Sequence, residues 1–159
     1  MFGFLLGRIL ARMDMPDSHR AYMTSFYRAS PKAIRKMAGL HKLANHREVV
    51  PVEARFAAIL VGELAEDCGP CVQIAVDQAR KAGVPDDQIE AVLQAHQSAM
   101  SPDVGLAFRL ARTVVTGTAD ADQLRQEVRD RWGEAGIVDL VVPMQVYRLY
   151  SMIKAGLGY

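Results

Sequence analysis

Prolines and glycines divide this chain into segments in which apolar residues recur every three or four positions. That spacing places the apolar residues on one face of an α-helix. Ser30 and Pro31 are typical of a helix start, as an N-cap and a first-turn proline, and Ser101 and Pro102 open a later segment. Strand patterns hardly occur, and the one β-prone run, 138–142, has helical flanks. The sequence therefore predicts an all-α fold.

Seven or eight helices are expected between these signals. Gly83 and Gly117 are expected helix ends, and Gly133 is expected to separate the last two helices. Pro143 should kink or interrupt the last helix because it lacks a backbone donor. The expected ranges are about 1–13, 31–44, Pro51 to the cysteines, the cysteines to 83, 86–99, 101–117, 119–132 and 135–155. Residues expected on inward faces include Ile34, Met37, Leu43, Phe56, Ile59, Leu60, Leu64, Leu93 and Met152.

The length of 159 residues, of which 50% are hydrophobic, suits one helical domain with a core over 51–159 and an N-terminal helical extension over 1–50. Nineteen basic and eighteen acidic residues are mostly interspersed, which argues against a nucleic-acid-binding face. No run of 18 apolar residues predicts a membrane span. The first 13 residues lack the features of a signal peptide and are expected to form an amphipathic helix. That helix can pack on protein or dock at an interface.

Cys68 and Cys71 are the only cysteines in the chain, and two residues separate them. At this spacing one thiolate can attack a substrate and the other can resolve the product to a disulfide. Asp67 is the expected N-cap of the helix that follows, so both thiols should lie at a helix start, where the helix dipole favours thiolate. A pair of this kind fits a reducing, cytoplasmic compartment.

Acidic residues surround the cysteines and would disfavour a thiolate, so one of them is expected to accept the thiol proton. Glu63 is the first candidate, because it lies five residues before Cys68 on the incoming helix. Glu66 and Asp67 are nearer in sequence but fit a turn and a cap. Gln73 can donate a hydrogen bond near Cys71. His96 is expected to face inward from the next helix.

Two other sites are consistent with parts of this pattern. Cys-Gly-Pro-Cys occurs in thioredoxins, but there it follows a β-strand, and here it follows a helical stretch. A zinc site could combine the cysteines with His41 and His46, although two residues five apart do not share a helix face. The tyrosines, Tyr22, Tyr27, Tyr147, Tyr150 and Tyr159, can line a pocket or pack in the core. No phosphate-binding, flavin or nicotinamide motif is present, so no cofactor is expected. A helical core of this size needs no metal to hold it together, so no metal is expected either.

The stretch from about 52 to 95 resembles the alkylhydroperoxidase D and carboxymuconolactone decarboxylase superfamily. The resemblance lies in an alanine-rich helix, a Cys-x-x-Cys at a helix start, the stop Ala82-Gly83-Val84-Pro85, and an acidic-capped helix. It implies an all-α subunit that assembles into trimers or hexamers. It also implies reduction of a hydroperoxide, with Cys71 attacking, Cys68 resolving and an external dithiol restoring the thiols.

The chain departs from the family motif at the proton relay. The family's glutamate, about twelve residues before the first cysteine, corresponds to Phe56, and its histidine, four residues after the second, corresponds to Ala75. Pro70 replaces a histidine often found between the cysteines. Two further hypotheses therefore stand beside the peroxidase: a non-enzymatic helical oligomer with a structural or redox-sensing cysteine pair, and a decarboxylase-type lyase.

Overall fold

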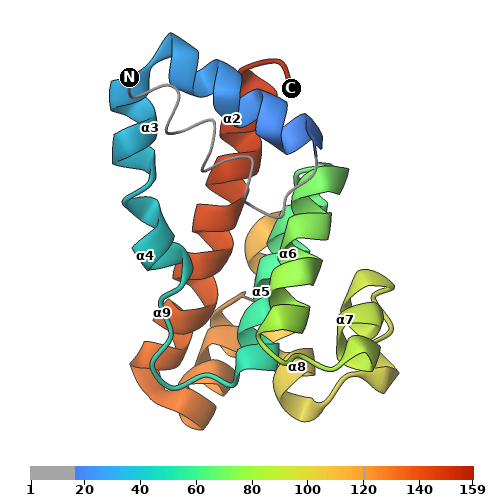
Figure 1. The fold of residues 1–159 in the computed structure, drawn as a ribbon. Coiled ribbons are helices and arrows are strands. Elements are labelled where there is room, and N and C mark those ends of the chain that lie inside the picture. Colours follow the sequence, from blue (N-terminus) through green and yellow to red (C-terminus); the bar gives the residue numbers. More distant parts are fainter. Residues whose placement is uncertain (1–16, 120) are drawn as a thin grey trace.

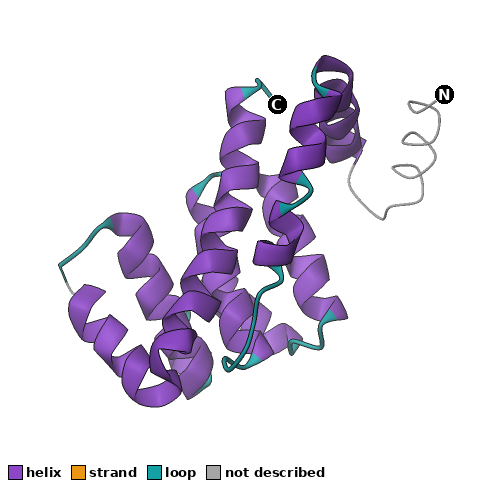
Figure 2. Ribbon diagram, turned by 90° about the vertical axis from the view of Figure 1, so that its left-hand side faces the viewer, coloured by secondary structure: helices purple, strands orange, loops and turns teal. Residues whose placement is uncertain are grey.

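The computed structural model describes residues 17–119 and 121–159, and these form eight α-helices and one 3-10 helix, with no strand among them (Figure 2). The predicted all-α class is confirmed. The expected helix over residues 1–13 lies outside the described residues. The helices are α2 (Asp17–Ala29), α3 (Pro31–Met37), α4 (Leu40–Ala44), α5 (Val52–Ala65), α6 (Gly69–Lys81), α7 (Asp86–Leu93), η1 (Gln97–Ala99), α8 (Pro102–Thr116) and α9 (Ala121–Gly156).

Helix α5 forms the centre of the core, and α6, α7, α8 and α9 all pack against it (Figure 1). All ten residues from Ala54 to Glu63 are buried, so other parts of the chain cover α5 on all sides. A surface helix would be buried on one face only. Alanines and Gly62 keep this helix thin, so that α9 can approach closely. The last residue of this buried stretch is a glutamate, Glu63.

Most expected helix boundaries are confirmed. Ser30 and Ser101 are N-caps whose hydroxyls accept from Ala33 N (3.2 Å) and Val104 N (3.3 Å). Gly117 ends α8 with φ +67°, a left-handed conformation that suits glycine. Gly133 (φ +73°) breaks α9, as expected.

Other expectations about the helices are wrong. Helix α2 lies within the expected N-terminal helical extension but was not among the expected ranges, because its sequence is polar on average, although its apolar residues share one face. The expected helix 31–44 is broken between α3 and α4, and the expected helix 86–99 ends at Leu93, before Ala95 takes a positive φ of 55°. Pro143 does not interrupt α9, in which Gly133 is the non-helical residue.

Four residues expected on inward faces are exposed: Leu43, Leu64, Leu93 and Met152. Leu43, Leu64 and Leu93 lie at the end of α4, α5 and α7 or one residue before it, where fewer neighbours cover a side chain. Met152 is five residues after the buried Tyr147, about 140° away. Apolar spacing alone therefore does not predict burial at a helix end or away from the packed face.

The N-terminal helices α2, α3 and α4 lie along the C-terminal half of α9, and the rings of Tyr22 and Tyr159 are 5.5 Å apart (Figure 1). The connection before α5 is held by the buried Asp139 of α9, which accepts from the backbone N–H groups of Glu48, Val49 and Val50 at 2.7–3.0 Å. None of the described helices combines the length and apolar character needed to cross a membrane.

Candidate functional site

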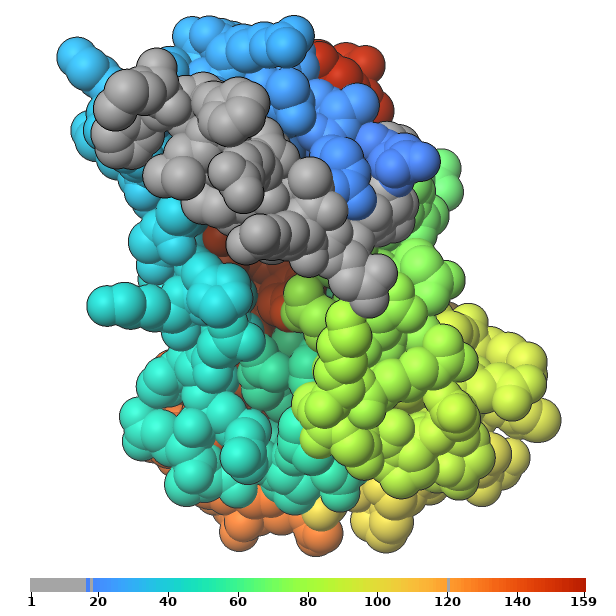
Figure 3. Space-filling view, viewed as in Figure 1, coloured from blue at the N-terminus to red at the C-terminus, as the bar shows by residue number. Residues whose placement is uncertain are grey.

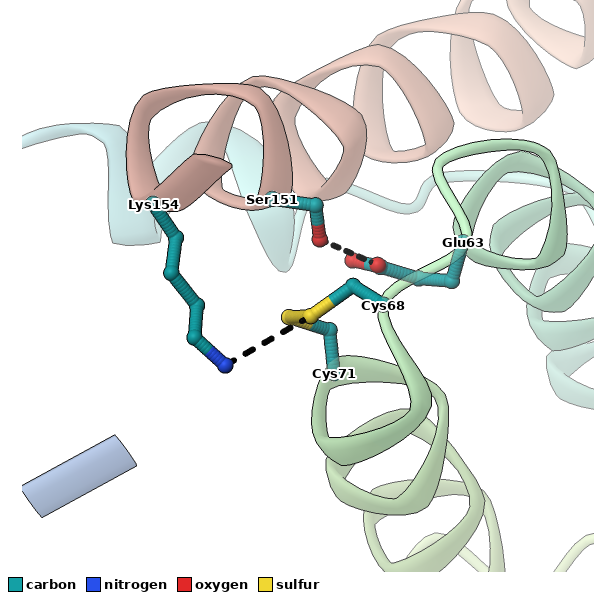
Figure 4. The surroundings of a disulfide bond; sticks show 5 residues. All are labelled: Glu63, Cys68, Cys71, Ser151 and Lys154. Atoms are coloured by element: carbon teal, nitrogen blue, oxygen red, sulfur yellow. Dashed lines mark hydrogen bonds between the residues drawn. A yellow bond between two sulfur atoms is a disulfide. The ribbon is translucent and has the colours of Figure 1, made fainter. Parts of the chain in front are cut away.

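Cys68 and Cys71 form a disulfide at the N-terminus of α6, with their Cα atoms 5.2 Å apart (Figure 4). Cys68 is the N-cap residue, and Cys71 lies in the first turn, where its N–H donates to the Cys68 carbonyl at 2.9 Å. Asp67 is therefore not the N-cap: it has a φ of 51° and belongs to the turn that leaves α5. The expectation that both sulfurs lie at a helix start is confirmed, so the positive end of the helix dipole favours a thiolate when the pair is reduced.

Glu63 lies beside this disulfide and is only 2% exposed (Figure 4). Its carboxylate accepts a hydrogen bond of 2.5 Å from the Ser151 hydroxyl on α9. Burial raises the pKa of the Glu63 carboxyl to about 7, and the charge of Glu66 adds to this, although the Ser151 hydrogen bond and two nearby cations lower it. A carboxyl group with a pKa near neutrality can both accept and return a proton.

Lys154 brings a positive charge to the other side of the sulfurs. This side chain of α9 is 5% exposed, and its Nζ donates to Cys68 Sγ at 3.7 Å (Figure 4). An ammonium group at this position stabilises a thiolate on Cys68 once the disulfide is reduced. The sulfurs thus lie between a buried carboxyl group and a buried ammonium group.

An ion pair also connects α5 to α9 near the disulfide. Arg148 of α9 contacts Glu66, the residue that follows α5, at 2.6 Å from Nη2 and 2.7 Å from Nε. Both side chains are largely shielded from water. The pair holds the C-terminal end of α5 against α9, and the Glu63–Ser151 hydrogen bond lies one turn away on the same two helices.

A cavity of about 430 Å³ opens next to Cys71 and Glu63, between α2, α3, α4, α6 and α9. Figure 3 shows the surface hollowed between α4 and α6, with α9 visible at the base of the hollow. Most of the lining is apolar or aromatic, which suits an organic ligand. Besides Cys71 and Glu63, the lining includes Met37, Ile74, Gln78, Tyr147, Tyr150 and Ser151.

Cys68 faces a different hollow. This one measures about 370 Å³ and is lined in part by Leu64, Val72 and Leu93. Leu64 and Leu93 are two of the residues that were expected inside and are exposed. The two cysteines therefore line different hollows, Cys71 the larger, mainly apolar one and Cys68 the smaller one.

The structure brings together only some of the predicted site residues. Glu63 meets the cysteines, as expected, whereas Gln73 is exposed and donates to Asp77 at 2.9 Å. The expectation that His96 faces inward is wrong, because α7 ends at Leu93 and leaves the histidine exposed. His46 lies 3.5 Å from Asp139, and the described residues contain no group of His, Cys, Asp and Glu suited to a metal ion.

Ser151 and Lys154 were not identified from the sequence, and the role of Tyr147 was left open. All three lie on the last helix, at positions i, i+4 and i+7, so they share a face. Polar residues that recur at the spacing of a buried face are the signal that could have identified them. Tyr147 confirms the pattern, because its hydroxyl donates to Gln78 in the cavity wall.

Compared with protein-family models, with curated proteins and with solved structures, the chain matches none of them.

Proposed function

We propose that this protein is a thiol-dependent redox enzyme that reduces an organic hydroperoxide through Cys68 and Cys71. One observation carries the proposal: Cys71 opens onto an apolar cavity beside Glu63, a buried carboxyl group with a pKa of about 7. A structural disulfide needs neither a neighbouring cavity nor a proton acceptor. Thiol oxidation by a hydroperoxide uses both.

The first step takes place at Cys71. Glu63 accepts the Cys71 thiol proton, and the thiolate attacks the terminal oxygen of the hydroperoxide. The O–O bond breaks, the sulfur becomes a sulfenic acid, and the departing alkoxide takes a proton from Glu63 to leave as an alcohol. The carboxyl group thus ends the step as it began.

The second step closes the disulfide. The Cys68 thiolate, which Lys154 stabilises, attacks the Cys71 sulfenic sulfur and displaces hydroxide, which is protonated to water. In total, two thiols and one hydroperoxide give one disulfide, one alcohol and one water. An external dithiol then attacks Cys68 from the hollow lined by Leu64 and Leu93, releases the Cys71 thiolate, and leaves as its own disulfide.

The resemblance to the alkylhydroperoxidase D group supports this proposal. In this chain the position of the family's glutamate is the buried Phe56, and Glu63 lies seven residues later, on the same face of α5 and about two turns along. We infer that Glu63 acts as the proton acceptor in place of the family's glutamate. The trimers or hexamers implied by the resemblance would appear in light scattering as multiples of the 17.5 kDa chain; a monomer would contradict that part.

Thiol counting with a stoichiometric organic hydroperoxide tests the proposal. Reduced protein mixed with one equivalent of cumene hydroperoxide should lose both thiols within minutes at neutral pH. Cys71→Ser should abolish this reaction, and Cys68→Ser should stop it at a sulfenic acid on Cys71 that dimedone traps. Glu63→Gln should slow it by about 10²–10⁴-fold, the range for loss of a general base. Glu90→Gln, at an exposed glutamate of α7, is the matched control and should react normally.

The alternatives give different results. If both thiols survive the peroxide, the pair is structural or responds to another oxidant, and the peroxidase proposal fails. The two cysteines have the opposite roles if Cys68→Ser consumes no more peroxide than buffer alone while Cys71→Ser forms a trapped sulfenic acid.

A further inference from the structure

The wall that α2 contributes to the cavity carries polar atoms without partners. Tyr22 is only 2% exposed, yet its hydroxyl finds no hydrogen-bond partner among the described residues, and neither does Nδ1 of His19. The two rings lie against each other, with centroids 5.6 Å apart, and both residues line the cavity. A buried hydroxyl without a partner is unfavourable, so a bound molecule that supplies an acceptor would remove this cost.

The rest of the lining restricts the charge of such a molecule. No lysine or arginine is among the described residues that line the cavity, and Glu63 is its one carboxylate. Burial lowers the pKa of His19, and the charge of Lys154 lowers it further, so the uncharged form of this ring is favoured. An anionic ligand would therefore meet no permanent cation in the lining and would be repelled by ionised Glu63.

The volume of about 430 Å³ lies within the range of sites that hold small organic ligands. Met23, Ile34, Met37 and Ile74 supply apolar contacts for the body of such a molecule. Methionine adapts to differently shaped ligands because its side chain is flexible and polarizable.

We propose that the cavity binds an uncharged, mainly apolar organic molecule that carries a hydroxyl or carbonyl oxygen, to which the Tyr22 hydroxyl donates a hydrogen bond. The binding site needs no reaction at the cysteines. The identification of this molecule with the substrate rests on the proposed function: the hydroperoxide group would then lie at Cys71 and Glu63, and a second oxygen function at Tyr22.

Equilibrium dialysis against three related probes tests the binding site. The oxidised protein, which cannot reduce a peroxide, is used with 1-naphthol, naphthalene and 1-naphthoate. One hydrogen bond to an otherwise unpaired hydroxyl should make 1-naphthol bind about tenfold more tightly than naphthalene. The anionic 1-naphthoate should bind more weakly than 1-naphthol.

Tyr22→Phe should remove the advantage of 1-naphthol and leave naphthalene binding unchanged. Tyr27→Phe is the matched control, because Tyr27 lies on the same helix outside the cavity lining, and it should bind like the wild type. The wild-type comparison alone overturns the proposal if no probe binds, if 1-naphthol and naphthalene bind alike, or if 1-naphthoate binds best. An equal loss in both tyrosine variants also overturns it.

The two proposals can fail separately. Selective 1-naphthol binding together with thiols that survive hydroperoxide would retain the ligand site and reject the peroxidase. Rapid thiol oxidation without selective binding would retain the peroxidase and reject Tyr22 as a recognition residue.

Discussion

Glu63 combines two features that oppose each other. It lies at the end of the buried stretch of α5, where a charged group is unfavourable, yet it retains Ser151 as a hydrogen-bond donor and Arg148 and Lys154 as nearby cations. Burial has the largest effect, and the pKa rises from 4.5 to about 7. The hydrogen bond and the two cations offset only part of the effect of burial, which leaves the pKa near neutrality. A proton acceptor at neutral pH requires such a pKa.

This pKa predicts a pH-dependent stability. Between pH 4.5 and 7 the folded protein holds a proton on Glu63 that the unfolded chain has released, so the free energy of unfolding should fall as pH rises through this range. A shift from 4.5 to about 7 corresponds to about 3 kcal/mol. Glu63→Gln has no such titration, so urea unfolding of the oxidised protein should show the variant gaining about 3 kcal/mol relative to wild type between pH 4.5 and 8.

The control for this prediction is the exposed Glu90. Glu90→Gln should keep the wild-type dependence of unfolding free energy on pH. Parallel pH profiles for Glu63→Gln and wild type would show that the Glu63 pKa is close to its ordinary value, and Glu63 would then lose its role as a proton acceptor.

Close packing of α5 against α9 brings the site together. A Cβ atom added at Gly62 would lie 2.7 Å from Met144 Cγ and 3.1 Å from Arg148 Cγ, both on α9. Gly62 therefore permits the approach that places Glu63 against Ser151 and Arg148 against Glu66. The glycine is needed for space between helices, since its own backbone is helical.

Gly62→Ala should consequently disturb the site as well as the fold. Overpacking of a buried helix contact costs about 1–3 kcal/mol, which urea unfolding would detect. Separation of the helices should also weaken the Glu63–Ser151 hydrogen bond and slow thiol oxidation. Gly156→Ala is the matched control: it lies at the end of α9 with no atom within 4 Å of the added Cβ, so its stability should change by less than about 0.5 kcal/mol. Equal effects of the two substitutions would refute the close-approach argument.

The helix ends show which structural features the local sequence can predict. Caps such as Ser30 and stops such as Gly117 act within one turn, so the local sequence predicts them well. Helix α2 was not predicted in this way, because its sequence is polar on average; its packing against α3 and the burial of Tyr22 arise only in the folded molecule.

Asp139 joins the N-terminal part of the chain to the core. It is fully buried, and its two oxygens accept from three consecutive backbone N–H groups, those of Glu48, Val49 and Val50. Burial opposes its ionisation, but these three hydrogen bonds and the nearby His46 outweigh it and lower the Asp139 pKa. The carboxylate thereby fixes the connection from α4 to α5, and with it the wall of the cavity that α4 supplies.

Asp139→Asn should destabilise the protein by about 2–4 kcal/mol. The amide has only one acceptor oxygen, and its NH₂ group would face backbone donors, so at least one buried N–H would lose its partner. Asp130→Asn, at an exposed aspartate of the same helix, should change stability by less than about 0.5 kcal/mol. Thermal unfolding at pH 7 compares the two, and equal melting temperatures would rule out this role for Asp139.

Local patterns in the sequence determined the helical class, most helix boundaries and the position of Cys68 and Cys71 at a helix start. These features depend on interactions between residues a few positions apart, so the local sequence is enough to predict them. The environment of the sulfurs was decided by tertiary packing, because Ser151 and Lys154 lie more than 80 positions from Glu63 and Cys68 and reach them only where α9 crosses α5 and α6. Glu63 is buried only after these helices pack together, and this burial raises its pKa. The cavity beside Cys71 also forms only then.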